Sequence, residues 1–391
     1  MTPSASPASC VPAEAVGAAA PALVLAGQSV RQLAQAAAAE GIPALALDAF
    51  GDRDTRAAAR WQAWRGFDAG NLLDALHEAA RAGAAGWIAG SGFEAHPGLL
   101  AAAAERLPLL GTAPDGWRRV RDPRRFFPLL DDLGLPHPDT RWDGPPADSS
   151  DWLVKDGAGC GGVHVRPAAG VGAAPGPTAF WQRRVAGTPM SVAFVADGRR
   201  ALLLGVNEQL AGAPHAPFAW AGAVGPLPVA GALHERLDAA LQRLVPACGL
   251  RGLASLDFML RPGGGVALLE VNPRPGGTLQ LYAPQSPLAL HLRGCRGEGG
   301  LPARPRPQPV MGLRVLYAPR ALHLSADTLR RLARRAWVHD LPLTPTGIGA
   351  GEPVCSLGAT APRADAVHAL LRRRHAELIE LLEDTVDELA C

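Results

Sequence analysis

Lysine is almost missing from this sequence. The 38 lysines and arginines comprise one lysine, Lys155, and 37 (38 − 1) arginines, and tyrosine occurs only 2 times. The formal net charge of +2 is spread along 391 residues, so it forms no basic stripe or tail of the kind that binds nucleic acid or anionic lipid. We therefore expect no nucleic-acid partner and no membrane partner.

Cysteine pairs and long apolar runs are also lacking. The 6 cysteines lie far apart and include no C-x-x-C pair, which argues against a zinc knuckle or a disulfide framework and favours a reducing cytoplasm. No uninterrupted apolar stretch reaches the roughly 18 residues of a membrane-spanning helix. Residues 1–20 lack the basic start of a signal peptide, and we expect them to be a disordered leader.

Apolar residues, by contrast, make up 48% of the chain, enough for about two or three packed units at this length. In residues 21–113, short apolar strands alternate with alanine-rich helices, which predicts a parallel sheet with helices on both faces. The loops at 27–29 and 90–94 should face a cleft. A nicotinamide dehydrogenase that binds NADH near Asp48 is an alternative, although the first turn, GQSVRQ, lacks the G-x-G-x-x-G pattern.

The pattern changes after a polar linker near residue 145. Alternating apolar positions then predict antiparallel strands. A helix is predicted over 234–248, and a hairpin that closes at RPGGG follows it. Residues 296–310 are rich in Gly, Pro and Arg and are typical of a connector. The chain ends in a predicted amphipathic helix, whose broad apolar face carries Leu370, Leu371, Leu378, Leu381 and Leu382.

Lys155 lies just before a glycine-rich turn, 157–162, in which four of six residues are glycine. Such a turn lets backbone N–H groups approach an anion closely. A compact ammonium can sit between phosphate oxygens where a planar guanidinium would overfill the space, so arginine is no equivalent. The alternatives are a mobile hairpin tip and a surface lysine without function.

The predicted hairpin carries the other charged residues of interest. Alternate side chains of a strand share one face, so Glu270, Asn272 and Arg274 should point the same way, and Asp257 on the paired strand can reach that face. Two carboxylates and an amide oxygen suit Mg²⁺, whereas without a metal the carboxylates would repel each other. A surface salt-bridge cluster on an edge hairpin is the alternative.

These residues give the chain a resemblance to the ATP-grasp superfamily of carboxylate-amine ligases. The resemblance covers about residues 21–295 and is carried by WLVKDGAGCGGV, WQRRVAGTPMSV and, most specifically, SLDF…LLEVNPRPGG. It implies an α/β protein of three parts, in which an ATP-grasp fold of two α+β subdomains clasps ATP. The parts are a pre-ATP-grasp Rossmann-like domain (21–113), an ATP-grasp domain (114–295, with a small lid subdomain at about 151–195) and a C-terminal extension packing on the core (296–391).

The resemblance also implies a role for each matched residue. Lys155 would contact the α and β phosphates of ATP, and Arg124 would supply a second nucleotide-binding cation. Arg274 would steady the transferred phosphoryl group. The remaining matched residues are the turn over the β and γ phosphates (Gly159, Cys160, Gly161 and Gly162), the hinge around adenine (Gln182, Arg183, Arg184 and Val185) and the magnesium ligands (Asp257, Glu270 and Asn272).

The implied reaction uses magnesium-ATP to activate a small-molecule carboxylate and join it to an amine. Glu94 could pair with the amine, Arg314 with the carboxylate, and Glu208 with the ribose. The segments GSGFE and WVHDLPLTPTGIGAGEPVCS are similar to ATP-grasp proteins of C1-carrier (methanofuran-type) cofactor biosynthesis, the tyramine-glutamate ligase group. A nucleotide-binding regulator without turnover is the alternative, and a homodimer is the expected assembly.

Overall fold

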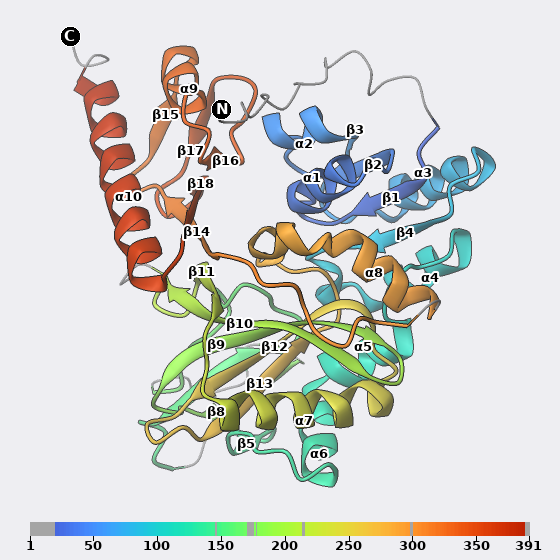
Figure 1. Ribbon diagram of the computed structural model, residues 1–391. Coiled ribbons are helices and arrows are strands. Elements are labelled where there is room, and N and C mark those ends of the chain that lie inside the picture. Colours follow the sequence, from blue (N-terminus) through green and yellow to red (C-terminus); the bar gives the residue numbers. More distant parts are fainter. Residues whose placement is uncertain are drawn as a thin grey trace, which may run out of the picture.

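Three consecutive parts of the chain build the fold of the computed structural model (Figure 1). The structure describes residues 20–144, 147–169, 176, 178–212, 216–297 and 300–387. The predicted leader at 1–20 therefore lies, except for its last residue, outside the described residues. The α/β class predicted from the sequence is confirmed.

The N-terminal part is a parallel sheet in the order β3-β2-β1-β4 with helices packed against it. Its strands are short, and β1, β2 and β4 are buried because helices cover both faces, whereas the edge strand β3 is mostly exposed. The elements are β1 (Leu23–Ala26), α1 (Arg31–Ala39), β2 (Ala44–Asp48), α2 (Arg53–Ala58), β3 (Arg60–Ala63), α3 (Ala69–Arg81), β4 (Gly86–Ala89) and α4 (Pro97–Arg106).

Two helices and a small sheet follow. The helices α5 (Pro114–Arg121) and α6 (Pro123–Asp132) are separated by Asp122, whose side chain caps α6. Each begins with proline, which suits a first helical turn and cannot continue a preceding one. The small sheet has the order β5-β8-β6-β7, with strands β5 (Thr140–Arg141), β6 (Trp152–Asp156), β7 (Arg166–Pro167) and β8 (Ala179–Arg183).

The largest sheet is antiparallel, in the order β13-β12-β9-β10-β11-β14-β18-β16. Its strands from the middle of the chain are β9 (Thr188–Asp197), β10 (Ala201–Ala211), β11 (Trp220–Leu227), β12 (Arg251–Leu260) and β13 (Val266–Asn272). The helix predicted over 234–248 is α7 (Gly231–Cys248), which packs with α6 on one face. The 3-10 helix η3 (Leu279–Gln285) and α8 (Pro287–Arg296) pack on the other face, next to α1.

The C-terminal extension continues this sheet as well as packing on it. Its strand β14 (Val310–Tyr317) pairs with β11, and β18 (Pro353–Ala361) and β16 (Val338–His339) follow. The close pairing requires Gly222, because a Cβ there would lie 2.0 Å from the Leu313 carbonyl oxygen. The extension also holds β15 (Leu322–Leu324), α9 (Ala326–Ala333), β17 (Thr346–Ile348) and α10 (Ala364–Asp387).

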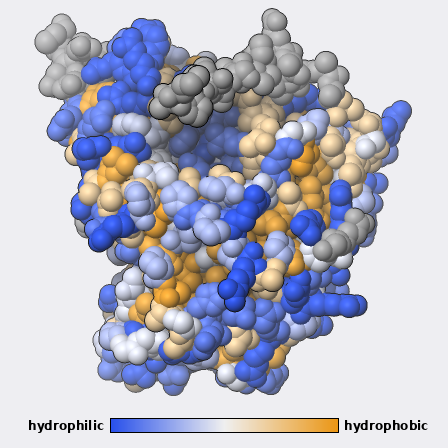
Figure 2. Space-filling model, in the orientation of Figure 1, coloured by the Kyte–Doolittle hydropathy of each residue, from blue (hydrophilic) through white to orange (hydrophobic). Residues whose placement is uncertain are grey.

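The predicted C-terminal amphipathic helix is α10. Leu371, Leu378, Leu381 and Leu382 are buried against β14 and β18, and Leu370 is partly buried. Hydrophilic residues cover the outer surface in this region, at the upper left of Figure 2. Within the described part of the chain, no helix has both the length and the hydropathy needed to span a bilayer.

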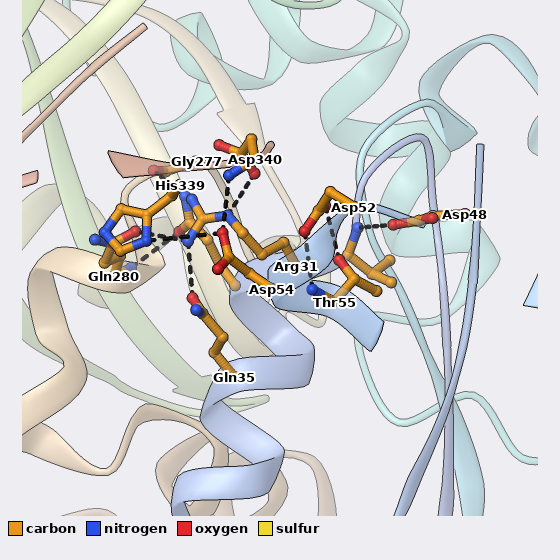
Figure 3. Close-up of polar contacts among 12 residues, drawn as sticks. Arg31, Gln35, Asp48, Asp52, Asp54, Thr55, Gly277, Gln280, His339 and Asp340 are labelled. Atoms are coloured by element: carbon orange, nitrogen blue, oxygen red, sulfur yellow. Dashed lines mark hydrogen bonds and ion pairs between the residues drawn. The ribbon is translucent and has the colours of Figure 1, made fainter. Parts of the chain in front are cut away.

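A buried cation joins the extension to the N-terminal part (Figure 3). The guanidinium of Arg31, on α1, forms an ion pair with Asp340 and donates to the amide oxygens of Gln35 and Gln280 at 2.8 and 2.9 Å. The backbone N–H of Asp340 donates to Asp54 at 2.9 Å. We call Arg31, Gln35, Asp54, Gln280 and Asp340 the seam cluster.

Candidate active site

Most of the predicted site residues surround one cavity of about 890 Å³. It lies between the small sheet, the β12–β13 end of the large sheet, and the loops after β1 and β4. The predicted residues that line it are Lys155, Cys160, Gly161, Gly162, Gln182, Arg183, Arg184, Val185, Asp257, Glu270, Asn272 and Arg274. The fold thus brings Lys155 and the hairpin residues, far apart in sequence, to the same space.

Lys155 projects from β6 into this cavity. Its Nζ donates to the Gln182 side-chain oxygen, on the neighbouring strand β8, at 2.7 Å. Desolvation lowers the pKa of Lys155, while the negative charges of Glu270 and Asp257 oppose this shift. An anion that entered the cavity would therefore pair with an ammonium that has already lost most of its hydration.

Asp257 and Glu270 are direct cross-strand partners on β12 and β13. The Asn272 amide donates to one oxygen of each, at 3.4 Å in both cases. Desolvation, and next the charge of Glu270, raises the pKa of Asp257. Desolvation would raise the pKa of Glu270 too, but the charges of Arg121 and Lys155 outweigh it and lower that pKa. The pair therefore favours cations nearby.

The donor set of this trio fits magnesium. It offers two carboxylates and an amide oxygen, the hard ligands that Mg²⁺ takes alongside water and nucleotide phosphates. A protein cation, Arg121, already lies against it. The described residues contain no group of three or more His, Cys, Asp or Glu side chains placed to hold a metal, so a site here would need the amide or the nucleotide as a further ligand.

Arg121 is a site residue that the sequence reasoning missed. Its Nη1 donates to Glu270 at 2.9 Å and to Asn272 at 3.3 Å, and its Nη2 donates to the Gly159 carbonyl oxygen at 2.9 Å. It is the last residue of α5 and lies directly before the break at Asp122. The Asp-Pro pair that follows it was the available signal, because proline at 123 starts a new helix and redirects the chain.

Arg124, which was expected to supply the second nucleotide-binding cation, does not line the cavity. Its side chain is exposed, and its guanidinium lies 5.3 Å from the ring centroid of Trp142. Because Arg124 lies in the first turn of α6 and Arg121 ends α5, the break between the helices sends them in different directions. Of these two arginines, Arg121 lines the cavity.

Arg274 is held by Glu94 from the N-terminal part. The two side chains form a buried ion pair with an Nη2–Oε1 distance of 2.5 Å, and Nε donates to the same oxygen at 2.7 Å. Glu94 also accepts from the Gly92 N–H at 2.7 Å. Glu94 therefore pairs with Arg274 in this structure, where the sequence suggested that it would pair with a substrate amine.

Two other predicted substrate contacts lie elsewhere. Arg314 and Glu208 are not among the residues that line the cavity. Glu208 pairs with His368 of α10 at 3.2 Å, while Arg314 is half-buried on β14, where desolvation lowers its pKa. Both assignments were made from position along the chain, which does not show the face of the sheet on which a side chain lies, since neighbouring strand residues face opposite sides.

The glycine-rich turn packs on the segment that leads into β11. The Gly161 carbonyl oxygen accepts from the Trp220 N–H at 2.9 Å. Gly162 has φ +75°, and a Cβ there would lie 1.9 Å from the Phe218 carbonyl oxygen. Only glycine fits this contact. Gly159 faces His164 and does not line the cavity, but its carbonyl oxygen binds Arg121.

The predicted adenine hinge borders the cavity beside apolar side chains. The backbone N–H groups of Arg183 and Arg184 already donate to the Asp139 and Asp151 carbonyl oxygens, at 2.8 and 2.7 Å. An adenine contact here would use other backbone groups of the segment. The apolar residues that line the same cavity include Leu153, Phe180, Met190, Phe258 and Met259.

The NADH alternative finds no support at Asp48. The carboxylate is fully buried and accepts from the N–H groups of Val30, Phe50 and Gly51 and from the Trp61 indole, at 2.8 to 3.2 Å. These four donors use both oxygens. Asp48 therefore organises the loop after β2, where a dinucleotide ribose would otherwise bind.

The geometry agrees with a family match. Residues 120–278 match the family described as ATP-grasp domain. The chain carries an ATP-grasp domain. The resemblance seen in the sequence is confirmed at this level, and the matched range contains both Lys155 and the Asp257, Glu270 and Asn272 trio.

Solved structures share this fold over most of the chain. The L-amino acid ligase from Bacillus licheniformis has a TM-score of 0.66 at 16% identity and covers 92% of this chain and 96% of its own. The N5-carboxyaminoimidazole ribonucleotide synthetase from Thermus thermophilus has a TM-score of 0.67 at 17% identity, covering 90% and 96%. At such identities the likeness shows the fold.

Curated relatives match over shorter stretches. Carnosine synthase 1 of Mus musculus is 29% identical over 248 residues, 56% of this chain and 29% of that protein. The D-alanine–D-alanine ligase of Oleidesulfovibrio alaskensis is 37% identical over 67 residues, 17% of this chain and 22% of that protein. The chain thus spans less than a third of the length of either relative.

Proposed function

We propose that this protein is an ATP-dependent carboxylate-amine ligase. Magnesium-ATP phosphorylates a small-molecule carboxylate, and an amine attacks the acyl-phosphate to give an amide, ADP and phosphate. The observation that carries the proposal is the single cavity shared by Lys155 and the Asp257, Glu270 and Asn272 trio inside an ATP-grasp domain. A triphosphate is bound by cationic side chains and a divalent metal, and this cavity is lined by the cations and by the side chains that would hold the metal.

Each group in the cavity has a part in this proposal. Lys155 and Arg121 bind phosphate oxygens, and the glycine-rich turn covers them with backbone N–H groups. Asp257, Glu270 and Asn272 would hold magnesium, which would supply charge neutralisation at the transferred phosphoryl group. Arg274, fixed by Glu94, donates to the acyl-phosphate oxygens.

The named relatives support the same reaction class. A ligase and a synthase are among the curated matches, and an L-amino acid ligase is among the structural ones. The biotin carboxylase domain of the Hydrogenobacter thermophilus 2-oxoglutarate carboxylase is described as a dimer in complex with MgADP. ATP and Mg²⁺ are accordingly the cofactors we assign, with a homodimer as the assembly and the cytoplasm as the location.

The acid and the amine should bind where the N-terminal loops meet the cavity. Gln28 and Ser91 line it there, and so do Trp220 and Thr278. A role in C1-carrier cofactor biosynthesis rests on the GSGFE and WVHDLP segments. Of these, Ser91 faces the cavity, whereas Glu94 holds Arg274 and Asp340 holds Arg31. Because of the similarity of these two segments, we keep tyramine and glutamate in the substrate panel.

The decisive experiment measures ADP release with magnesium-ATP across a matrix of carboxylic acids and amines. Hydroxylamine is added in a parallel series, because it converts an acyl-phosphate to a hydroxamate. The proposal expects acid-dependent hydroxamate and amide formation. ATP binding without turnover over the whole matrix would instead favour a nucleotide-binding regulator, and competition by NADH would favour the dehydrogenase.

A further inference from the structure

Arg121 is bonded to the same oxygens that a magnesium ion would need. Its side chain is 9% exposed, and it reaches Glu270 and Asn272 at 2.9 and 3.3 Å. Its Nε is buried without a hydrogen-bond partner. An arginine with a fixed structural place normally satisfies such an atom. The guanidinium is thus well bound at one end and incompletely satisfied at the other.

The same side chain ties the trio to the glycine-rich turn. Nη2 donates to the Gly159 carbonyl oxygen at 2.9 Å, so one guanidinium bridges β13 and the turn that would cover the phosphates. A metal ion on Glu270 would place a second positive charge beside the guanidinium and would take the oxygen that it now binds. Both cations cannot keep their best positions.

We propose that Arg121 is a positioning residue that stands in for magnesium between Glu270, Asn272 and Gly159, and that it yields these oxygens when the metal binds. In this structure it pairs with Glu270 and holds the turn through the Gly159 carbonyl oxygen. Magnesium bound to the trio together with a nucleotide would displace the guanidinium toward the phosphates and free the Gly159 carbonyl oxygen of the turn. This inference rests on the proposed function, because it takes the trio as the metal ligands.

One consequence separates this role from that of an ordinary phosphate ligand. If Arg121 competes with magnesium, removing its charge should tighten the binding of Mg²⁺ alone, without nucleotide. If Arg121 served only to hold the trio in shape, removing it would weaken metal binding. The two roles therefore predict opposite signs.

The test measures Mg²⁺ binding to the full-length protein by titration calorimetry in the absence of nucleotide. Arg121→Met is expected to lower the Kd for Mg²⁺ at least fivefold. Arg124→Met removes the same charge three residues along, on the exposed side of α6, and is expected to change the Kd less than twofold. Arg121→Lys, which keeps the charge, should stay close to wild type.

A second readout follows the turn itself. Hydrogen exchange of the amides of residues 157–162 should be faster in Arg121→Met than in wild type, and saturating Mg²⁺ should bring wild type to the same rate. Arg121→Gln carries both expectations if the Met variant does not fold by circular dichroism. An unchanged or raised Kd for Mg²⁺ in the charge-removing variant overturns the inference.

Glu270→Ala separates this inference from the proposed function. If Glu270→Ala abolishes Mg²⁺ binding while Arg121→Met fails to tighten it, the metal site stands and the role of Arg121 is wrong. If Glu270→Ala binds Mg²⁺ as wild type does, the ion does not use the trio. The proposed metal ligands and the inference then fail together.

Discussion

Two buried arginines, Arg31 and Arg121, organise two very different regions. In the seam cluster Arg31 is 2% exposed and is satisfied by one carboxylate and two amide oxygens from α1, η3 and the extension. Arg121 is 9% exposed and is bonded to a carboxylate, an amide and a backbone carbonyl at the wall of a cavity. Both bridge segments far apart in the sequence.

The difference lies in what surrounds each cation. The polar contacts of Arg31 are to one carboxylate and two amide oxygens of the seam cluster. This cluster lies outside the cavity lining. At Arg121 two paired carboxylates and a desolvated lysine face the same empty space. Groups with shifted pKa values that face a cavity are candidates for function, whereas the polar contacts of Arg31 are all to other side chains of the seam cluster. The following changes would break or sharpen this contrast.

The largest effect is expected for Glu270→Ala. Removing this carboxylate should reduce magnesium-dependent ADP release about 1,000-fold or more, as the loss of a major electrostatic group in an active site does. A coupled ADP assay measures it. Glu208→Ala is the matched control, since that carboxylate pairs with His368 away from the cavity. Near-normal turnover in Glu270→Ala would show that the trio does not hold the metal.

Arg31→Met should act on stability instead of turnover. It leaves Asp340 without its buried partner, and breaking such a pair costs about 3 kcal/mol. Urea denaturation should show this loss, while the affinity for an ATP analogue stays unchanged. Arg53→Met, at an exposed position nearby, should be neutral. If nucleotide affinity fell instead, the seam cluster would belong to the functional site and the contrast would be lost.

Lys155→Met should weaken nucleotide binding. A hydrogen bond to a charged group contributes about 1.5–3 kcal/mol, so the Kd of a fluorescent ATP analogue should rise about tenfold to 150-fold. Lys155→Arg should recover little of this loss, because a planar guanidinium does not replace a compact ammonium. Full recovery of the affinity in the arginine variant would mean that the size of the side chain does not require lysine at this position.

The smallest effect is a pH dependence beside the seam cluster. Desolvation raises the pKa of Asp52, which caps α2, to about 6, against the opposing hydrogen bond from the Thr55 N–H. Because the folded pKa is raised, the stabilisation by protonated Asp52 is fully present below about pH 4 and is lost as the pH rises through 6.

Asp52→Asn removes this titration while keeping a capping oxygen. Between pH 4 and pH 7, wild type should lose on the order of 2 kcal/mol more stability than Asp52→Asn. Denaturation midpoints at the two pH values measure it. Parallel pH profiles of the two proteins would show that Asp52 keeps its ordinary pKa.

Much of the site followed from residue type and strand period. The alternation of LLEVNPR places Glu270 and Asn272 on one face, and pairing with β12 brings Asp257 opposite Glu270. The lone lysine marked the other side of the cavity. Arg121 was missed because the Asp122-Pro123 pair marks a break between α5 and α6 but does not say which way each helix runs, and that direction decides that Arg121 faces the cavity.

The amino-acid sequence by itself determined the elements and the chemistry they carry. Apolar periodicity set the parallel and antiparallel sheets, and the prolines set where helices start. Lys155, Asp257, Glu270 and Asn272 predicted a magnesium and phosphate site, and the fold brings these four residues to one cavity. Tertiary structure alone decided the partners of the charges. Ion pairs between distant segments depend on how whole units pack. The pairs formed in this way are Arg274 with Glu94, Arg31 with Asp340 and Arg121 with Glu270.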